Sequence, residues 1–347
     1  MKKKYSVAIV GFGKLGILYS SLSKIHPDTN LKYIIEPNFF LRFFLKKRLN
    51  NVKVFKNIDQ LIKYDSSVDI AFITTPNYSH FDIANKLAKA KIGIFVEKPL
   101  ALNLKEVSKL GLIIKKNNIK LQVGYMLRYC KTYQRVKELI INKELGKIEN
   151  FSCSMFSSQV FKKTNNWRFK NDKSGGGVLI TQNTHLIDLL VWFFGMPKSI
   201  LSFTNKIYSE QVEDEVSAKF YYNDYYGEME TSWSKKGYRN LTTKININFE
   251  FGSIEVNEDE LKINPNSKAD WTKKNKLNKV ESFKPNFYDL AGDYYSNQFD
   301  DFIKFFKSQN TNNTNNILDS TKIHYIIDNI YLSSANKKEI KLYENFS

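Results

Sequence analysis

A glycine-rich turn near the start of the chain has the residue types and spacing of a dinucleotide-binding site. Residues 11–16 read Gly-Phe-Gly-Lys-Leu-Gly, directly after an apolar stretch and directly before a helical pattern. In such a G-x-G-x-x-G turn the first glycine permits the tight turn, the second lets a pyrophosphate approach the backbone, and the third allows close helix–strand packing. The cofactor-binding residues predicted here are Gly11, Phe12, Gly13, Lys14, Leu15 and Gly16.

An acid stands where the ribose of a bound adenosine would be recognised. Glu36 follows Gly16 by 20 residues and ends the second apolar stretch. A carboxylate at this place accepts hydrogen bonds from the ribose hydroxyls and repels a 2′-phosphate. No arginine directly follows it, since Arg42 is six residues away. The sequence therefore predicts NAD as the cofactor, with NADP less favoured.

Two further side chains could move a proton. Hydride transfer from an alcohol needs a base for the hydroxyl proton and a donor for the oxygen that gains charge, while the cofactor carries the redox chemistry. Lys98 stands between Glu97 and Pro99 at the end of an apolar stretch, and His185 lies on an apolar helical pattern. Partial burial near a cationic nicotinamide would lower the pKa of Lys98 and suit it to proton exchange. The alternatives are an ordinary solvated lysine and a core histidine with satisfied hydrogen bonds.

Alternating strands and helices over the first ~125 residues would position these side chains. Short β-branched runs that are apolar on both faces predict strands, and the periodic stretches between them predict helices. The expected strands are 6–10, 31–35, 52–55, 68–74, 92–96 and 120–124, and the expected helices are 14–24, 39–49, 57–64, 79–90 and 103–117. This order predicts a doubly wound parallel sheet of the Rossmann type. Pro76, His80, Lys98 and Arg128 follow strand ends, where the sites of such sheets lie, so they can converge.

The pattern changes after residue 124, so the expected domains are 1–124 and 125–347. The expected elements of the second domain are helices at 131–141, 178–194, 291–308 and 319–335, strands at 148–160, 200–208, 215–222, 228–234, 242–249, 253–256 and 260–263, and an Asn-rich loop at 310–316. Consecutive strands with short turns predict an α+β domain with a large, mostly antiparallel sheet. Phe220, Tyr222, Trp233 and Phe249 are expected on an exposed face, which predicts a homodimer or homotetramer through that sheet.

Several short motifs follow one another in a fixed order along the chain. They are Thr74-Thr75-Pro76-Asn77 with His80, Glu97-Lys98-Pro99, Gly124-Tyr125 with Arg128, Trp167-Arg168, Gly175-Gly176-Gly177, and His185 with Asp188. With the glycine turn they resemble the Gfo/Idh/MocA oxidoreductases, the family of glucose–fructose oxidoreductase and inositol dehydrogenase, over residues 5 to about 195. The resemblance implies a Rossmann domain joined to a domain with a mostly antiparallel sheet. It also implies hydride transfer between NAD or NADP and a sugar, cyclitol or nucleotide-sugar carbon.

The resemblance assigns roles to the remaining motif residues. It implies cofactor contacts from Thr75, Pro76, Asn77, His80, Glu97, Lys98 and Arg128, and substrate contacts from Lys98, Trp167, Arg168, Thr181, His185 and Asp188. Lys98 corresponds to the family's catalytic lysine. Other interpretations stay open. His80 could be a helix N-terminal residue and Asp188 a packing group, while Trp167 and Arg168 could form a structural cation–π pair.

One position departs from the family pattern. Many family dehydrogenases have an aspartate four residues before the histidine, where this chain has Thr181. Because threonine cannot serve as a carboxylate base, we expect the proton to pass through Lys98 and His185, with the Thr181 hydroxyl aiding position. The same departure keeps open a catalytically weak dinucleotide-binding sensor or partner protein. A reductase of another carbonyl or imine is a further alternative.

The amino-acid composition limits the classes of partner that this protein is expected to bind. The net charge is +18, but only six of the 53 basic residues are arginine, the side chain that nucleic-acid readers favour. We therefore expect no nucleic-acid partner, and a small sugar-like substrate instead. No run of 18 apolar residues exists, so no membrane partner is expected. Cys130 and Cys153 form no metal-type spacing, which favours a reducing cytoplasm and no metal.

Overall fold

The computed structural model describes residues 4–163, 166–269, 279–282, 293–309 and 315–343. The chain forms two compact units. The first contains Met1–Tyr125 and Ser296–Thr321, and the second contains Met126–Tyr295 and Lys322–Ser347. Ser296–Thr321 thus belongs to the first unit, although the sequence pattern placed it in the second domain. Most of the Asn-rich loop expected at 310–316 lies outside the described residues.

The first unit is built on a six-stranded parallel sheet. Its strands are β1 (Tyr5–Val10), β2 (Thr29–Ile35), β3 (Lys53–Phe55), β4 (Ile70–Ile73), β5 (Gly93–Val96) and β6 (Leu121–Val123). The strand order is β3-β2-β1-β4-β5-β6, the order of a doubly wound dinucleotide-binding sheet. Successive strands are therefore added outward in one direction from β1 to β3 and in the opposite direction from β4 to β6, which confirms the predicted fold class of this half.

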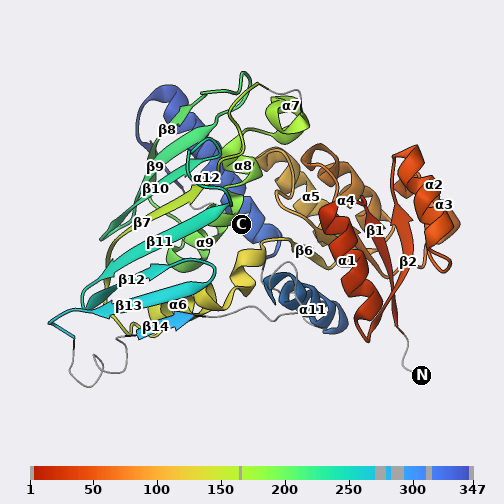
Figure 1. Ribbon diagram of the computed structural model, residues 1–347, viewed down its shortest axis with the longest axis horizontal. Coiled ribbons are helices and arrows are strands. Elements are labelled where there is room, and N and C mark those ends of the chain that lie inside the picture. Colours follow the sequence, from red (N-terminus) through yellow and green to blue (C-terminus); the bar gives the residue numbers. More distant parts are fainter. Residues whose placement is uncertain (1–3, 164–165, 270–278, 283–292, 310–314, 344–347) are drawn as a thin grey trace. The chain divides into compact units, whose positions relative to one another are not determined.

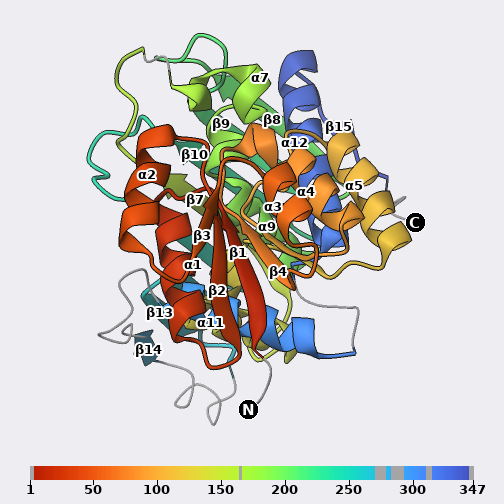
Figure 2. The ribbon, with the colours of Figure 1, turned by 90° about the vertical axis from the view of Figure 1, so that its right-hand side faces the viewer.

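Helices cover both faces of this sheet. Figure 2 shows α1 (Lys14–Ile25) and α2 (Phe39–Arg48) on one face, and α3 (Ile58–Tyr64), α4 (His80–Lys89) and α5 (Leu104–Asn117) on the other. Every residue of β4 and β5 is buried as a result. This is why these strands are apolar at every position instead of at alternate ones.

Helix α11 (Asp293–Lys307) joins the first unit through aromatic packing. Its Phe299 ring stacks on Phe72 of β4 with centroids 5.1 Å apart, and its Phe302 ring meets the edge of the Phe95 ring of β5 at 5.5 Å. Gly93 leaves room for this helix, because a Cβ there would lie 2.3 Å from the Phe306 ring. Burial of these rings explains why a segment so distant in sequence returns to the first sheet.

The second unit is built on a nine-stranded sheet. Its strands are β7 (Ile148–Phe156), β8 (Ser199–Asn205), β9 (Glu215–Tyr221), β10 (Tyr226–Ser232), β11 (Thr242–Phe249), β12 (Gly252–Val256), β13 (Glu260–Pro265), β14 (Lys279–Ser282) and β15 (Ile340–Lys341). Their order is β14-β13-β12-β11-β7-β10-β9-β8-β15. Among these described strands, β7 and β10 form the one parallel pair. The expected mostly antiparallel sheet is confirmed. The sequence missed β14 and β15, which are too short to show a periodic pattern.

One face of this sheet is buried and the other is exposed. The described helices of the unit are α6 (Lys131–Ile141), α7 (Asn171–Ser174), α8 (Val178–Thr181), α9 (Thr184–Phe194) and, from Lys322 onward, α12 (Ile317–Asn336). Short 3₁₀ turns are η1 (Asn77–Ser79) in the first unit and η2 (Met126–Tyr129) and η3 (Trp167–Phe169) in the second. Figure 1 shows α9 and α12 on the same side of the sheet. Ser202 of β8 donates from its hydroxyl to the Ile330 carbonyl of α12 at 2.7 Å, which fixes that helix to the buried face.

The expected exposure of four aromatic residues is wrong for three of them. Phe220, Trp233 and Phe249 are buried, and Tyr222 is partly exposed. Alternation along β9 and β11 turns the aromatic positions toward the helices. The outer face carries ion pairs between neighbouring strands, Lys219 with Glu228 and Lys244 with Glu255, beside the exposed Phe203 and Tyr226.

The helix expected over 178–194 is also wrong in one respect, because it is broken into α8 and α9. The Val178 carbonyl accepts both the Gln182 N–H at 3.0 Å and the Asn183 N–H at 2.9 Å. The Asn183 side-chain amide donates to the Met229 sulfur at 3.0 Å. This extra residue in the turn interrupts the α-helical register. Among the described residues no single helix could span a membrane; Asn171–Thr181 and Thr184–Phe194, bent by 50°, satisfy length and composition only as a pair.

Candidate active site

Two glycines of the turn after β1 are required by the packing of the protein itself. Gly11 has φ +91°, and a Cβ there would lie 2.9 Å from the Thr75 methyl group. A Cβ on Gly16 would lie 2.0 Å from the Gly11 carbonyl oxygen. The Thr74 hydroxyl donates a hydrogen bond to the Gly11 carbonyl at 2.7 Å. The turn after β1 and the end of β4 therefore hold one another in place.

Gly13 differs from Gly11 and Gly16, because no described residue packs so closely that it requires a glycine there. A Cβ on Gly13 would have no atom of the described residues within 4 Å, and its φ of −79° is open to any residue. Gly13 is the N-cap of α1, where no side chain caps the helix and no acidic residue stands in the first turn. Unsatisfied N–H groups and the helix dipole favour an anion there. The open space and these donors fit the pyrophosphate of a dinucleotide.

Two backbone hydrogen bonds fix the Glu36 carboxylate beside the glycine turn. Glu36 lies just beyond β2 and is 8% exposed. Its carboxylate accepts the Phe12 N–H at 3.0 Å and the Asn38 N–H at 2.8 Å. These two bonds aim a charged acceptor beside the glycine turn and leave lone pairs for further donors. The structure thus brings Glu36 and the glycine turn together, as the sequence predicted.

His80 is a buried tie between two loops. One ring nitrogen lies 2.7 Å from the Pro99 carbonyl and the other 2.7 Å from the Thr75 carbonyl. Burial lowers the pKa of His80, while the two carbonyls oppose that shift. A neutral ring donates to one carbonyl and a protonated ring to both. In either state His80 connects the loop after β4, which carries Pro76 and Asn77, to the loop after β5.

Glu97 and Lys98 place two titratable groups side by side after β5. Burial raises the pKa of Glu97 to about 7, against the opposing effects of the Lys98 charge and the Tyr19 hydroxyl. That hydroxyl donates to the carboxyl at 2.9 Å. Gly124 makes room for it, because a Cβ there would lie 3.0 Å from Glu97 Oε2. Lys98 itself is half-buried, and its charge opposes the rise in the pKa of the neighbouring Glu97 carboxyl.

In the second unit Arg128 and Asp188 bind each other. Arg128 donates from Nε to Oδ2 of Asp188 at 3.0 Å and from Nη2 to Oδ1 at 2.6 Å. Both side chains are buried, and the guanidinium lies 5.8 Å from the centre of the Trp192 ring. This two-point pair joins η2 to α9. The sequence predicted Arg128 for the cofactor and Asp188 for the substrate. Those contacts stay predictions, and the pair gives both residues a structural task.

His185 and Thr181 stand on either side of the helix break. His185 is the second residue of α9 and is 4% exposed. Thr181 ends α8 and donates its hydroxyl to the Gly177 carbonyl at 2.7 Å. The i, i+4 relation of a continuous helix therefore does not connect these two residues. Their assignment to catalysis and substrate contact stays a prediction.

Sequence reasoning missed Glu213, which anchors the start of α8. Its carboxylate accepts the N–H groups of Gly177 and Leu179, each at 2.9 Å, and the Tyr331 hydroxyl at 3.0 Å. Burial raises its pKa in spite of these donors. A Cβ on Gly177 would lie 1.9 Å from the Glu213 carbonyl oxygen, which explains the glycine. Glu213 and Gly177 are 36 residues apart, so no local spacing could have connected them.

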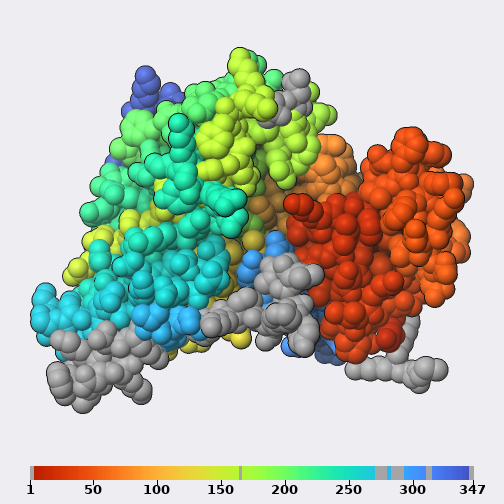
Figure 3. Space-filling view, in the orientation of Figure 1, coloured from red at the N-terminus to blue at the C-terminus, as the bar shows by residue number. Residues whose placement is uncertain are grey.

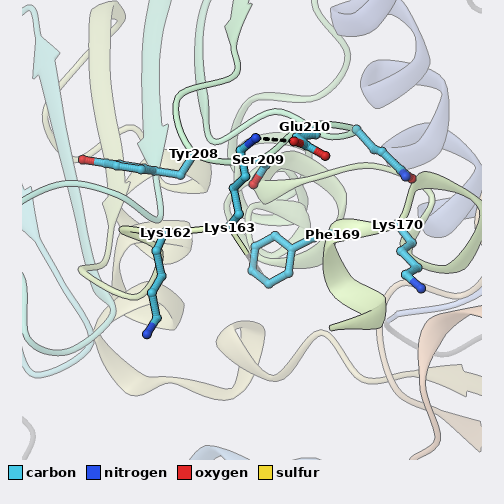
Figure 4. Close-up of a pocket in the computed structure, with 8 residues that line it drawn as sticks. Lys162, Lys163, Phe169, Lys170, Tyr208, Ser209 and Glu210 are labelled. Atoms are coloured by element: carbon cyan, nitrogen blue, oxygen red, sulfur yellow. Dashed lines mark hydrogen bonds and ion pairs between the residues drawn. The ribbon is translucent and has the colours of Figure 1, made fainter. Parts of the chain in front are cut away.

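The loop that contains Trp167 and Arg168 borders a cavity of about 250 Å³. Its lining residues are Lys162, Lys163, Phe169, Lys170, Tyr208, Ser209, Glu210 and Gln211. Figure 4 shows the Phe169 ring between the Lys162 and Lys170 side chains, whose amino ends point apart, while Lys163 pairs with Glu210. The exposed Arg168 lies 5.6 Å from the centre of the Trp167 ring, as expected for a cation–π pair. Within the described ranges no group of three His, Cys, Asp or Glu could hold a metal ion.

Both units contain a segment that matches a protein-family model. Residues 5–125 match the family model described as an oxidoreductase family with an NAD-binding Rossmann fold, and residues 133–255 match that of the Gfo/Idh/MocA C-terminal domain. The chain belongs to the Gfo/Idh/MocA oxidoreductase family. The family predicted from the short motifs is thereby confirmed, as are the NAD-binding Rossmann domain and the fold class.

Curated relatives and a solved structure are similar to this Gfo/Idh/MocA chain. The chain is 28% identical to myo-inositol 2-dehydrogenase of Thermotoga maritima over 41% of its length and 42% of the relative's. It is 28% identical to glucose-6-phosphate 3-dehydrogenase of Bacillus subtilis, over 59% of its length and 58% of the relative's. These alignments span about half of each curated relative. The fold is similar to that of levoglucosan dehydrogenase in complex with NADH and levoglucosan, with a TM-score of 0.88, 22% identity, and coverage of 99% of this chain and 100% of the other.

Proposed function

We propose that this protein is an NAD-dependent dehydrogenase or reductase that transfers a hydride between the nicotinamide and a CH–OH carbon. The observation that carries the proposal is the anchored Glu36 carboxylate beside the open N-terminus of α1 at Gly13, in a chain of this oxidoreductase family. The carboxylate accepts from ribose hydroxyls, and the N–H groups of α1 receive the pyrophosphate. When NAD is bound, it supplies the hydride acceptor.

The substrate class is a sugar, cyclitol or nucleotide sugar. This rests on the relatives, which are named for oxidation of an inositol and of a phosphorylated glucose, and on a structural neighbour solved with levoglucosan. All of these compounds present a secondary alcohol on a ring. We expect one such ring carbon to be the site of reaction here.

Lys98 and His185 are the proposed catalytic residues. Lys98 donates a hydrogen bond to the reacting oxygen and stabilises the charge that develops on it. His185 accepts the hydroxyl proton in the oxidative direction and returns it in reduction. Thr181 positions the substrate through its hydroxyl, since it has no carboxylate with which to take the proton.

The experiment measures cofactor binding and turnover separately. NADH and NADPH are titrated into the purified protein, and NAD-dependent oxidation is assayed over a panel of sugars, cyclitols and nucleotide sugars. We expect NADH to bind tighter by about 1–3 kcal/mol, because Glu36 repels a 2′-phosphate. Equal or tighter NADPH binding would contradict the cofactor proposal.

Thr181 favours one second candidate, a dinucleotide-binding sensor of weak activity. The same experiment distinguishes it, since a sensor binds NADH and turns over no member of the panel. Turnover of a carbonyl or imine in the reductive direction alone would indicate a reductase of another substrate class.

Assembly and location are part of the proposal. We propose a homodimer or homotetramer through the outer face of the C-terminal sheet, where strand-to-strand ion pairs such as Lys219–Glu228 offer both signs of charge to a second copy. A cytoplasmic location is supported by the free, buried thiols of Cys130 and Cys153.

A further inference from the structure

We propose that the exposed face of α2 docks the protein on the surface of an anionic lipid bilayer. The docking face is defined as Phe39, Phe40, Phe43 and Phe44 together with Lys46, Lys47 and Arg48. None of these residues is assigned to hydride transfer, so membrane docking is a property beyond the proposed function. The contact would be peripheral, with the helix lying along the interface.

Four phenylalanines on one short helix face solvent. Phe39 is 65% exposed, Phe40 80%, Phe43 54% and Phe44 55%, and Leu45 is the buried residue of α2. Positions i, i+1, i+4 and i+5 lie on one side of a helix, so the rings form one continuous surface. In Figure 3 this segment belongs to the orange-red surface of the first unit. Large apolar side chains grouped on a surface mark an interaction site.

Cations share this face with the rings. Lys47 lies 4.5 Å from the centre of the Phe43 ring and Arg48 lies 5.6 Å from that of Phe44. The last turn carries Lys46, Lys47 and Arg48, and α2 has no acidic residue. Residues 38–64 contain seven basic residues and one acid, Asp59, which pairs with Lys86 at 2.6 Å. The nearby Glu36 is buried and holds two backbone N–H groups. Within residues 38–64, therefore, no acidic residue is left to balance the positive charge of α2.

Rings and cations interleaved on a protruding helix fit a bilayer surface. Aromatic rings partition to the boundary between headgroups and acyl chains, and lysine or arginine gains affinity from anionic headgroups within a Debye length. A second copy docked through the same face would oppose like charges, which disfavours that occupant. The sequence suggested no membrane partner because it contains no run of 18 apolar residues. Peripheral docking does not require one.

Vesicle sedimentation tests the proposal. The full chain is mixed with vesicles of phosphatidylcholine alone, or with about 30% phosphatidylglycerol, at low and high salt. We expect binding to the anionic vesicles, release at high salt, and weak binding to the neutral ones. Phe40→Ser with Phe44→Ser should weaken binding to the anionic vesicles at least about tenfold, because two rings lose their apolar contact. Neutralising Lys46, Lys47 and Arg48 to Gln should weaken it on the order of a hundredfold.

Matched changes on α5 and α1 serve as controls. Leu112 and Ile25 are 72% and 77% exposed, so Leu112→Ser with Ile25→Ser removes similar apolar surface. Changing the exposed Lys105, Lys115 and Lys116 to Gln removes the same charge. Both controls should bind the vesicles as the wild type does, and circular dichroism checks that every variant is folded.

Three results would overturn the proposal. One is failure of the wild type to bind anionic vesicles, which would leave an acidic protein as the occupant. The second is equal loss in the control variants, which would show nonspecific attraction by the net charge. The third concerns the variant with Phe40→Ser and Phe44→Ser. If it binds vesicles as the wild type does but sediments without vesicles as a smaller particle than the wild type, α2 is a contact between copies of the chain.

Discussion

At the scale of single residues, the proton chemistry of this protein centres on the adjacent pair Glu97 and Lys98. Burial of Glu97 penalises its charged form, while Lys98 favours it, and the balance raises the pKa of this carboxyl to about 7. A small change in the charge at Lys98 therefore changes the protonation of its neighbour. Lys98 was predicted from its place at a strand end, whereas the titration of Glu97 depends on burial and on Tyr19 from α1.

Substitution of the proposed catalytic pair should separate chemistry from cofactor binding. Lys98→Met and His185→Ala should each lower kcat by about 10²–10⁴-fold, because each removes a group that transfers or stabilises a proton in the transition state. NADH affinity, measured by fluorescence titration, should stay close to that of the wild type. If His185→Ala left kcat unchanged on the true substrate, the proton would have to leave through Lys98 or water.

Thr181→Ala is the matched variant for that pair. It removes a neutral hydroxyl that bonds the Gly177 carbonyl, and we expect a loss in kcat of about tenfold or less. Steady-state kinetics on the same substrate measures this. A loss as large as that of His185→Ala would mean that Thr181 takes part in proton transfer.

The raised pKa of Glu97 predicts a pH-dependent stability. The folded state favours protonated Glu97, so its stabilising effect is complete below the unfolded pKa near 4.5 and is lost as pH rises through about 7. The free energy of unfolding of the wild type should therefore fall relative to Glu97→Gln between these pH values, by about 3 kcal/mol at most. Urea unfolding at pH 5.5 and 8 measures the difference.

A surface carboxyl provides the control for this measurement. Glu339 is exposed, so Glu339→Gln should follow the wild type at both pH values. If Glu97→Gln kept the pH dependence of the wild type, the carboxyl would titrate at an ordinary value, and burial would not control it.

At the scale of elements, the glycines of the turn after β1 have different roles. Gly16 allows α1 to approach β1, and a Cβ there would meet the Gly11 carbonyl oxygen at 2.0 Å. Gly13 leaves an opening at the N-terminus of α1 that no described protein atom fills. The sequence pattern alone assigns both to one site, and the structure distinguishes the glycine needed for packing from the glycine available to a ligand.

This distinction predicts opposite effects of two similar substitutions. Gly16→Ala should lower the thermal unfolding midpoint by several degrees, since backbone atoms must move. Gly13→Ala should leave the midpoint of the free protein nearly unchanged and weaken NADH binding, because the methyl group occupies the space of the pyrophosphate. Thermal unfolding with and without NADH measures both. Unchanged NADH affinity in Gly13→Ala would contradict the assignment of this opening to the cofactor.

At the scale of the whole molecule, the outer face of the nine-stranded sheet bears on assembly. It carries ion pairs, including Lys244 with Glu255, while Phe220, Trp233 and Phe249, which the sequence placed on an exposed face, are buried. We expect light scattering to give a mass of two or four chains of 40.6 kDa. Because the proposed contact includes these ion pairs, high salt should shift the assembly toward smaller particles. A 40.6 kDa particle across a wide concentration range would contradict it.

Local patterns were sufficient for much of this protein. Apolar runs identified β4 and β5 because strands covered on both faces are apolar throughout, and the glycine turn with Glu36 indicated the cofactor site because turn geometry and ribose recognition depend on nearby residues. The order of short motifs was enough to predict the family. These features depend on contacts within one β-α-β unit, where spacing along the chain determines spacing in the fold.

Only the tertiary structure decided the rest. The return of α11 to the first sheet depends on Phe299 meeting Phe72, and the break between α8 and α9 involves Asn183 meeting Met229. The anchoring of Gly177 by Glu213 and the pairing of Arg128 with Asp188 likewise join residues tens of positions apart. A side chain's partner across such a distance leaves no periodic trace in the sequence. Its burial, and with it its charge, follows from which distant segments pack around it.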